Sequence, residues 1–106
     1  MVKRFEIYWV DLDPTKGSEI KKKRPCIVIS PDELNQYLNT VIIAPLTSTI
    51  KSYPTRINIK VKNKQGQVAL DQIRTIDKSR LKSKIGKVES PQQKKISSIL
   101  VELFTI

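Results

Sequence analysis

Hydrophobic and polar residues alternate along several short segments of this chain, and the pattern predicts a mainly β fold. The clearest case is 56–62, where isoleucine and valine occupy every second position, as in a half-buried antiparallel strand. Asn63–Gly66 is typical of a hairpin loop, and Pro45 near the end of its segment indicates an edge strand or a bulge. Segments rich in β-branched or aromatic residues predict further strands at 7–11, 26–30, 40–46, 67–70 leading into 72–76, and 84–88.

The end of the chain has a helical pattern instead. Ser90-Pro-Gln-Gln93 combines an N-cap serine, a proline at the first helical position and a glutamine at the third. Apolar residues then recur at helical spacing from Ile96 to Leu103, which predicts an amphipathic helix over 91–104 that covers the sheet or its opening. A shorter helix or turn is expected at 32–38. Five or six short strands with one late helix favour a small SH3-like antiparallel β-barrel.

The length and the charge limit what the chain can do. A chain of 106 residues supports one modest core, so we expect a single domain over 1–106. Twenty Lys and Arg against ten Asp and Glu give a formal net charge of +10, which favours a polyanionic partner. Nucleic acid, an acidic protein and an anionic membrane all fit that description. No apolar segment is long enough to cross a bilayer, and the charged N-terminus does not resemble a signal peptide, so we expect a cytoplasmic protein.

Two residue types are nearly absent, and this excludes several kinds of chemistry. The chain has no histidine, which rules out mechanisms with an imidazole acid, base or triad. Its one cysteine, Cys26, cannot form an internal disulfide, in agreement with a reducing compartment. The common zinc sites are also excluded. We therefore expect no metal and no cofactor.

Three groups of residues could carry chemistry on phosphate. Arg24 ends the basic run that begins at Lys21, and Pro25 fixes its entry into a strand; a guanidinium can hold two phosphate oxygens at once. The same run is equally consistent with solvated surface charge. The hydroxyls of Thr47–Thr49 could bind a phosphate, or belong to an ordinary loop. Glu19 could accept a proton or a base amino group, or be a surface carboxylate.

A second basic band and two aromatic residues suggest contacts with nucleic acid. Such a band binds phosphates without reading sequence, but it can equally be a solubilising face. Its members are Arg74, Lys78, Arg80, Lys82, Lys84 and Lys87, opposed only by Asp77. Tyr8 and Trp9 could stack on bases, although at the centre of a strand at least one of them is expected in the core.

Three blocks of sequence, taken in order, resemble one family. The first is Ile7-Tyr-Trp-Val-Asp-Leu-Asp-Pro-Thr-Lys-Gly-Ser-Glu19, followed by Arg24-Pro-Cys-Ile-Val-Ile-Ser-Pro31. The second is Ala44-Pro-Leu-Thr-Ser-Thr49 with Tyr53-Pro54, and the third is Val68-Ala-Leu-Asp-Gln-Ile-Arg-Thr-Ile-Asp77. In these blocks the chain is similar to the MazF/PemK ribonuclease toxins of bacterial type II toxin–antitoxin modules.

The resemblance implies a function. Members of this family are homodimers of SH3-like barrels, with the fold shared by MazF, PemK and CcdB toxins. They cut single-stranded RNA, usually messenger RNA, at short sequences without a metal, which blocks translation and arrests growth. The products end in a 2′,3′-cyclic phosphate and a 5′-hydroxyl. The implied partner is an antitoxin with an acidic, disordered C-terminal segment that folds on the toxin, and the complex binds DNA.

The resemblance also implies roles for single residues. Arg24 and Thr47 match the catalytic pair, and Glu19 lies in a loop that shapes the site. Because a guanidinium stays protonated and is a poor proton acceptor near neutral pH, Glu19 is an auxiliary candidate for the base. The other auxiliary or substrate-binding candidates are Gly17, Ser18, Lys22, Lys23, Ser48, Thr49, Gln72, Arg74 and Asp77.

Two other functions fit the same fold. A gyrase-poisoning toxin acts by protein contact and depends on a C-terminal Trp-Gly-Ile signature, whereas this chain ends Leu103-Phe-Thr-Ile106. A non-catalytic nucleic-acid-binding barrel would bind RNA with a steep salt dependence and leave it intact.

Overall fold

The computed structural model describes residues 1–106, and it is mainly β with a helix at the C-terminal end, as predicted. The strands are β1 (Glu6–Asp11), β2 (Lys23–Val28), β3 (Thr40–Thr47), β4 (Arg56–Val61), β5 (Lys64–Ala69), β6 (Arg74–Asp77) and β7 (Leu81–Lys87). The helices are α1 (Asp32–Tyr37) and α2 (Ser90–Phe104), and 3-10 turns lie at Leu70–Gln72 and Lys78–Arg80. None of these helices is long and apolar enough to span a membrane.

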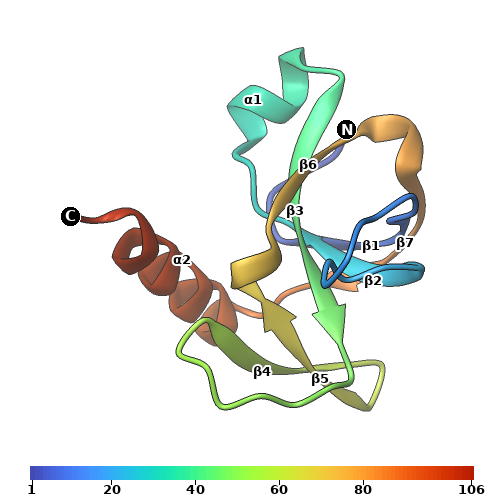
Figure 1. The fold of residues 1–106 in the computed structure, drawn as a ribbon. Coiled ribbons are helices and arrows are strands. Elements are labelled where there is room, and N and C mark those ends of the chain that lie inside the picture. Colours follow the sequence, from blue (N-terminus) through green and yellow to red (C-terminus); the bar gives the residue numbers. More distant parts are fainter.

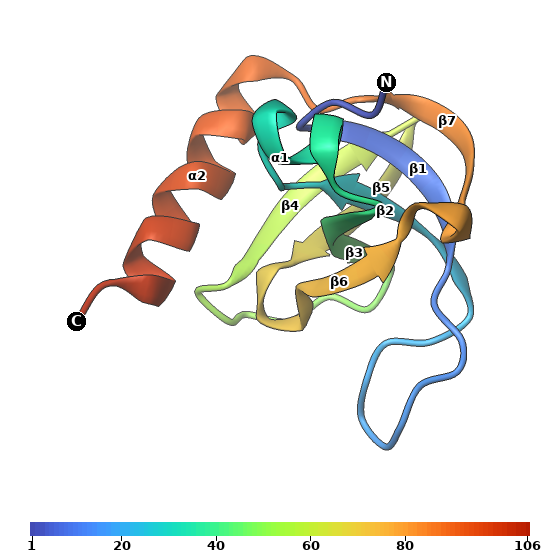
Figure 2. The ribbon, with the colours of Figure 1, turned by 90° about the horizontal axis from the view of Figure 1, so that it is seen from above.

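All strands belong to one curled antiparallel sheet. Its order is β4-β5-β3-β2-β1-β7, and β6 pairs with β3 beside this path. Strand β3 runs through the middle of the molecule (Figure 1). The β4–β5 hairpin lies at its C-terminal end, and β2, β1 and β7 follow on the side of β3 away from this hairpin. Helix α2 lies beside β4, and the long β1–β2 loop projects from the opposite side of the molecule (Figure 2).

Two hydrophobic cores lie on the two faces of the central strands. Residues 26–28 of β2 are fully buried and alternate between the two cores, because successive side chains of a strand point to opposite faces. The first core consists of Ile7, Ile27, Ile29, Ala44, Leu46, Ile57, Ile59, Val68, Leu70, Val88 and Ile96. The second consists of Val10, Leu12, Cys26, Val28, Val41, Ile43 and Ile76.

Helix α2 covers the first core, as its spacing predicts. Ile96 is fully buried, and Ile99 and Leu100 pack partly against the core, whereas Leu103 is exposed. The predicted N-cap is wrong by one residue: the helix begins at Ser90, its N-cap is Glu89, and no side chain caps it. The side-chain amide of Gln93 instead donates to the carbonyl of Val88 at 2.8 Å.

Strand β2 begins earlier than predicted. It starts at Lys23 rather than Cys26, so Arg24 and Pro25 lie inside the strand and not in front of it. Pairing with β1 extends the strand, since Arg24 lies opposite Val10. Proline is tolerated here because β3 pairs with β2 only from Cys26 onward, which leaves one side of Pro25 without a neighbouring strand.

Of the two positions predicted for Pro45, an edge strand or a bulge, the edge strand is wrong. Strand β3 is central and pairs with β2, β5 and β6. Pro45 lies between the segment that pairs with β6, which ends at Ile43, and Leu46, where pairing with β5 begins. Its missing N–H therefore falls where β3 exchanges one neighbour for another.

The β4–β5 hairpin is tighter than predicted. Its turn consists of Lys62 and Asn63, both with positive φ (50° and 65°), instead of the four-residue loop 63–66. Gly66 lies within β5, where a Cβ atom would be 3.1 Å from the carbonyl oxygen of Thr47. Glycine at this position therefore lets β5 approach β3 closely.

The segment after this hairpin also differs from the prediction of one strand through Ile76. Strand β5 ends at Ala69, the 3-10 turn follows, and β6 pairs with the other end of β3. The predicted strand at 84–88 is present as β7, which begins earlier, at Leu81, and pairs with β1.

Candidate active site

A cleft of about 410 Å³ opens where β2 begins and β3 ends. Arg24 lines it together with Thr47 and Ser48, although Arg24 is distant from these two residues in the sequence. Its other lining residues are Trp9, Lys23, Pro25, Leu46, Ile59, Val61, Lys62, Lys64, Gln65, Gly66 and Ile85. Four of the fourteen are cationic and none is acidic, so the cleft favours an anionic ligand.

The Arg24 side chain is anchored at Nε, and its two terminal nitrogens are free. Its Nε donates to the carbonyl oxygen of Lys21 at 2.8 Å, and its two terminal nitrogens have no protein partner. The rigid β1–β2 pair fixes its backbone, because Val10 lies directly opposite. A guanidinium anchored in this way can present two N–H groups to a phosphate.

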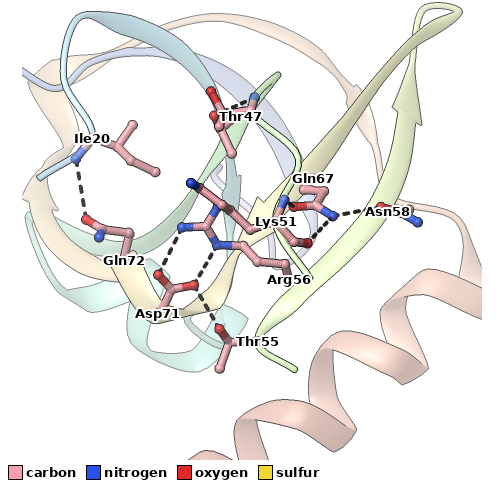
Figure 3. A network of polar contacts seen from close by, with 10 residues as sticks. Ile20, Thr47, Lys51, Thr55, Arg56, Asn58, Gln67, Asp71 and Gln72 are labelled. Atoms are coloured by element: carbon pink, nitrogen blue, oxygen red, sulfur yellow. Dashed lines mark hydrogen bonds and ion pairs between the residues drawn. The ribbon is translucent and has the colours of Figure 1, made fainter. Parts of the chain in front are cut away.

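Thr47 is the last residue of β3, and it is 93% buried. Its hydroxyl oxygen accepts a hydrogen bond from the backbone N–H of Thr49 at 3.1 Å (Figure 3). The hydroxyl hydrogen is therefore left to donate to a ligand. Ser48 is exposed and lines the cleft, whereas Thr49 is exposed outside it.

A buried glutamine that the sequence did not reveal as functional supports the loop after Thr47. The side chain of Gln67, opposite Thr47 in the sheet, accepts from the N–H of Lys51 at 3.0 Å and donates to its carbonyl at 2.9 Å. It also donates to Asn58 at 3.0 Å (Figure 3). This clamp fixes the course of the loop beside the cleft. No local pattern signals it, because Gln67 and Lys51 are sixteen residues apart.

Three other predicted residues come together in a second cavity of about 200 Å³. Glu19, Gln72 and Arg74 line it, next to Pro45 and Asp71. Gln72 accepts a hydrogen bond from the N–H of Ile20 at 3.4 Å (Figure 3). Glu19 accepts one from the N–H of Lys16 and does not line the cleft that contains Arg24.

Two arginines of the predicted basic band anchor the β1–β2 loop. Arg74 donates to the carbonyl of Leu12 at 2.9 Å. Arg80 donates to the carbonyls of Asp11 and Asp13 at 3.1 and 2.8 Å. These guanidinium groups therefore use part of their N–H donors for β1 and its loop, and fewer N–H donors remain for a phosphate.

Three predicted residues of the β1–β2 loop, Gly17, Ser18 and Lys22, line neither cavity. Gly17 has a φ of 55°, in the left-handed region, and Ser18 follows it at the exposed tip. Lys22 donates its N–H to the carboxylate of Asp13 at 3.2 Å, while Lys23 lines the cleft.

Asp77 also lies outside both cavities. Its carboxylate accepts the N–H of Ser79 at 2.8 Å and caps the 3-10 turn after β6. This backbone hydrogen bond lowers the pKa of Asp77. Its observed role is therefore in the turn.

Cys26 offers no nucleophile. Burial raises the pKa of its thiol to about 12, against the opposing charges of Arg74 and Arg24. A thiol with this pKa remains protonated near neutral pH.

The two aromatic residues of β1 have different environments. Tyr8 is half-buried, packs against the second core and donates to Glu6 at 3.1 Å. Trp9 is 43% exposed and lines the cleft. Neither residue is among the buried core residues, so the prediction that at least one of them belongs to the core is met only as far as Tyr8 packs against it.

An ion pair between the start of β4 and the 3-10 turn after β5 was not apparent in the sequence. Arg56 forms two hydrogen bonds with Asp71, at 2.8 and 3.1 Å, and Thr55 donates to the same carboxylate (Figure 3). The hydrogen bond from Arg56 lowers the pKa of Asp71, against the effect of burial. The side chain of Arg56 is only 8% exposed, so losing its partner would leave a nearly buried charge.

Asp71→Ala is therefore expected to lower the free energy of unfolding by about 2 kcal/mol at pH 7. Because the folded-state pKa is lowered, this contribution is complete above the unfolded pKa of about 3.9 and is lost as the pH falls through the folded-state pKa. Urea unfolding at pH 7 and pH 3 measures the difference between variant and wild type. Glu33→Ala, at an exposed carboxylate of α1, is the control. An equal difference at both pH values would contradict this account.

Comparison with known proteins agrees with these features. Residues 3–104 match the family described as PemK-like, MazF-like toxin of type II toxin–antitoxin system. The chain is 35% identical to the endoribonuclease MazF of Staphylococcus saprophyticus, over 94% of this chain and 88% of that relative.

Solved structures establish the same fold. MazF from Deinococcus radiodurans has a TM-score of 0.87 at 23% identity, with 99% of this chain and 97% of that chain covered. An endoribonuclease in complex with its cognate antitoxin, from a mycobacterial species, has a TM-score of 0.82 at 24% identity, with 96% and 93% covered. The chain therefore belongs to the PemK-like, MazF-like toxins of type II toxin–antitoxin systems, as a homologue of the endoribonuclease MazF.

Proposed function

We propose that this toxin is a metal-independent endoribonuclease that cuts single-stranded messenger RNA at short sequences and so blocks translation. One observation carries the proposal: Arg24 and Thr47, which match the family's catalytic pair, line one cationic cleft that contains no carboxylate. Such a cleft attracts a phosphodiester and stabilises the charge that develops on its oxygens.

The proposed reaction is an attack by the ribose 2′-hydroxyl on the adjacent phosphorus. The 2′-oxygen forms a bond to phosphorus as the bond to the 5′-oxygen breaks, which gives a 2′,3′-cyclic phosphate and a 5′-hydroxyl. The 2′-hydroxyl loses its proton, and the 5′-oxygen gains one. In-line alignment of the three reacting atoms supplies a large part of the rate.

Each catalytic residue has a distinct part in this reaction. The terminal N–H groups of Arg24 hold the non-bridging oxygens and stabilise their charge in the transition state. Arg24 also donates a hydrogen bond to the departing 5′-oxygen and remains protonated, and the 5′-oxygen takes its proton from solvent. The hydroxyl oxygen of Thr47 already accepts a hydrogen bond from the N–H of Thr49, which leaves the hydroxyl hydrogen to donate. This hydrogen donates to one phosphate oxygen and fixes its position. No carboxylate lines the cleft to take the 2′-proton, so alignment and charge stabilisation carry the catalysis, and the proton passes to solvent.

Incubation of the purified chain with a single-stranded RNA in EDTA tests this proposal. Cleavage is expected to continue in EDTA, and to stop when the ribose on the 5′ side of the cut carries a 2′-deoxy substitution. Cleavage that is lost on chelation would overturn metal independence. Cleavage of the 2′-deoxy substrate would overturn the attack by the 2′-hydroxyl. RNA that binds but remains intact would identify a non-catalytic binding protein.

We also infer that the active form is a homodimer and that an antitoxin with an acidic, disordered C-terminal segment inhibits it. The net charge of +10 supports an acidic partner, whose binding should weaken as salt rises. Sedimentation measures the dimer, and competition with labelled RNA measures the antitoxin. A monomer at working concentration, or an antitoxin that does not displace RNA, would contradict these inferences.

A further inference from the structure

Trp9 is the only tryptophan of the chain, and it stands at the surface of the cleft that contains Arg24 and Thr47. The side chain is 43% exposed although it lies in the middle of β1. The pairing of β1 with β7 shifts register between Tyr8 and Val10, so Trp9 has no partner in β7 and faces only Pro25 of β2. A large apolar surface is thus kept open beside the catalytic pair.

The surroundings of Trp9 suit a nucleobase. The apolar part of the cleft is formed by Ile59, Val61 and Ile85, with Leu46 and Pro25. Lysines 23, 62 and 64 also line the cleft, the last two at the tip of the β4–β5 hairpin. An aromatic face with apolar walls accepts a base of any identity, and nearby cations accept the phosphates attached to it.

Strand register places this surface on a defined side of the catalytic arginine. Directly opposite residues of an antiparallel pair share a face, so Trp9 lies with Pro25, and Arg24 lies on the other face with Val10. Pro45, which lines the second cavity, is opposite Cys26 and therefore on the face of Arg24. Arg24 also lines the cleft with Trp9, whereas it does not line the second cavity, so a phosphate that it holds lies at the edge of the tryptophan cleft.

We propose that the cleft is a nucleotide subsite in which Trp9 stacks on a base next to the scissile phosphate. The lysines of the hairpin tip hold the phosphate beyond that base. This assignment rests on the proposed function, since it places the base relative to the bond that is cut. Stacking selects for an unpaired base, so the subsite favours single-stranded RNA.

The fluorescence of the single tryptophan tests the subsite directly. The probe is an uncleavable 2′-O-methyl oligonucleotide that contains the mapped cut sequence, prepared with an abasic residue at each position in turn. Binding of the intact probe is expected to quench Trp9, and one abasic position next to the cut should restore the emission. That abasic probe should bind about 10-fold more weakly, as measured by anisotropy.

Variants separate stacking from general effects on the fold. Trp9→Ala should bind the intact probe about 10-fold more weakly than the wild type does. Its affinity for the abasic probe should be little lower than for the intact probe, because the substitution and the missing base remove the same contact. Trp9→Phe should retain binding within about threefold. The double variant Trp9→Phe with Tyr37→Trp moves the single tryptophan to α1, to a position that is 78% exposed and outside the cleft. Its emission should therefore not change when the probe binds.

Two results would overturn the subsite: an unchanged Trp9 emission when anisotropy shows that the probe is bound, or equal abasic penalties in wild type and Trp9→Ala. The emission of the wild type needs no variant, so a poorly folded Trp9→Ala does not obstruct the test. If unmodified RNA is cut while emission stays constant, the subsite fails and the proposed function stands. If unmodified RNA is not cut at all, the proposed function fails first.

Discussion

Arg24→Ala is expected to lower the rate of RNA cleavage about 10³-fold with little change in stability. Its terminal nitrogens have no partner in the protein, so the loss falls on the transition state rather than on the fold. Only the hydrogen bond from its Nε to Lys21 contributes to the folded structure, which limits the change in unfolding free energy to about 1 kcal/mol. Single-turnover cleavage of a saturating RNA in EDTA, together with urea unfolding, measures the two effects separately.

Two matched variants sharpen this prediction. Arg24→Lys keeps the positive charge and loses the planar fork, so it should recover only a small part of the activity. Lys21→Ala, three residues earlier in the loop, removes one charge and leaves the guanidinium in place, so it should weaken RNA binding without a large change in the cleavage rate. A folded Arg24→Ala that cleaves within about tenfold of wild type would remove Arg24 from the catalytic group.

Thr47→Val is expected to lower the single-turnover rate about 10²-fold. The valine fills nearly the same space at this buried position and cannot donate to a phosphate oxygen. The variant also leaves the N–H of Thr49 without its acceptor, which should reduce the unfolding free energy by about 1 kcal/mol. Rate measurements at saturating RNA and thermal unfolding distinguish these consequences.

Thr47→Ser is the control, because it keeps the hydroxyl. It should retain most of the activity and the hydrogen bond from Thr49. If Thr47→Val and Thr47→Ser were equally active, the hydroxyl would have no part in catalysis. If both were equally inactive and unstable, the position of Thr47 would matter only for packing.

Much of the fold could be predicted from periodicity, and the errors have local causes. The alternation in 56–62 and the apolar spacing from Ile96 identify β4 and α2 correctly, because each pattern reports directly which face is buried. The sequence predicts the start of β2 too late, because basic residues and a proline are typical of a loop. Pairing with β1 overrides that local preference, and only the tertiary structure reveals it.

The catalytic pair could be proposed only because three blocks of sequence resemble a family. From chemistry alone, Arg24 could not be told from surface charge, nor Thr47 from an ordinary loop residue. The structure adds that both line one cleft and that Glu19 lines another cavity. The proposed roles of Glu19, Gln72 and Arg74 remain predictions.

Contacts between distant segments could not be read from the sequence at all. The Gln67 clamp on Lys51 and the Arg56–Asp71 pair join residues about fifteen positions apart. The exposure of Trp9 results from a register shift between β1 and β7 that no local pattern encodes. These contacts and the exposure of Trp9 depend on which strands become neighbours in the sheet.

Mapping the ends of RNA cut by the purified chain in EDTA tests the central claim most directly. Mass spectrometry of the fragments should find a 2′,3′-cyclic phosphate on the upstream product and a 5′-hydroxyl on the downstream product, at one short sequence. Fragments that end in a 3′-hydroxyl and a 5′-phosphate, or RNA that remains intact, would contradict attack by the 2′-hydroxyl in the cleft of Arg24 and Thr47.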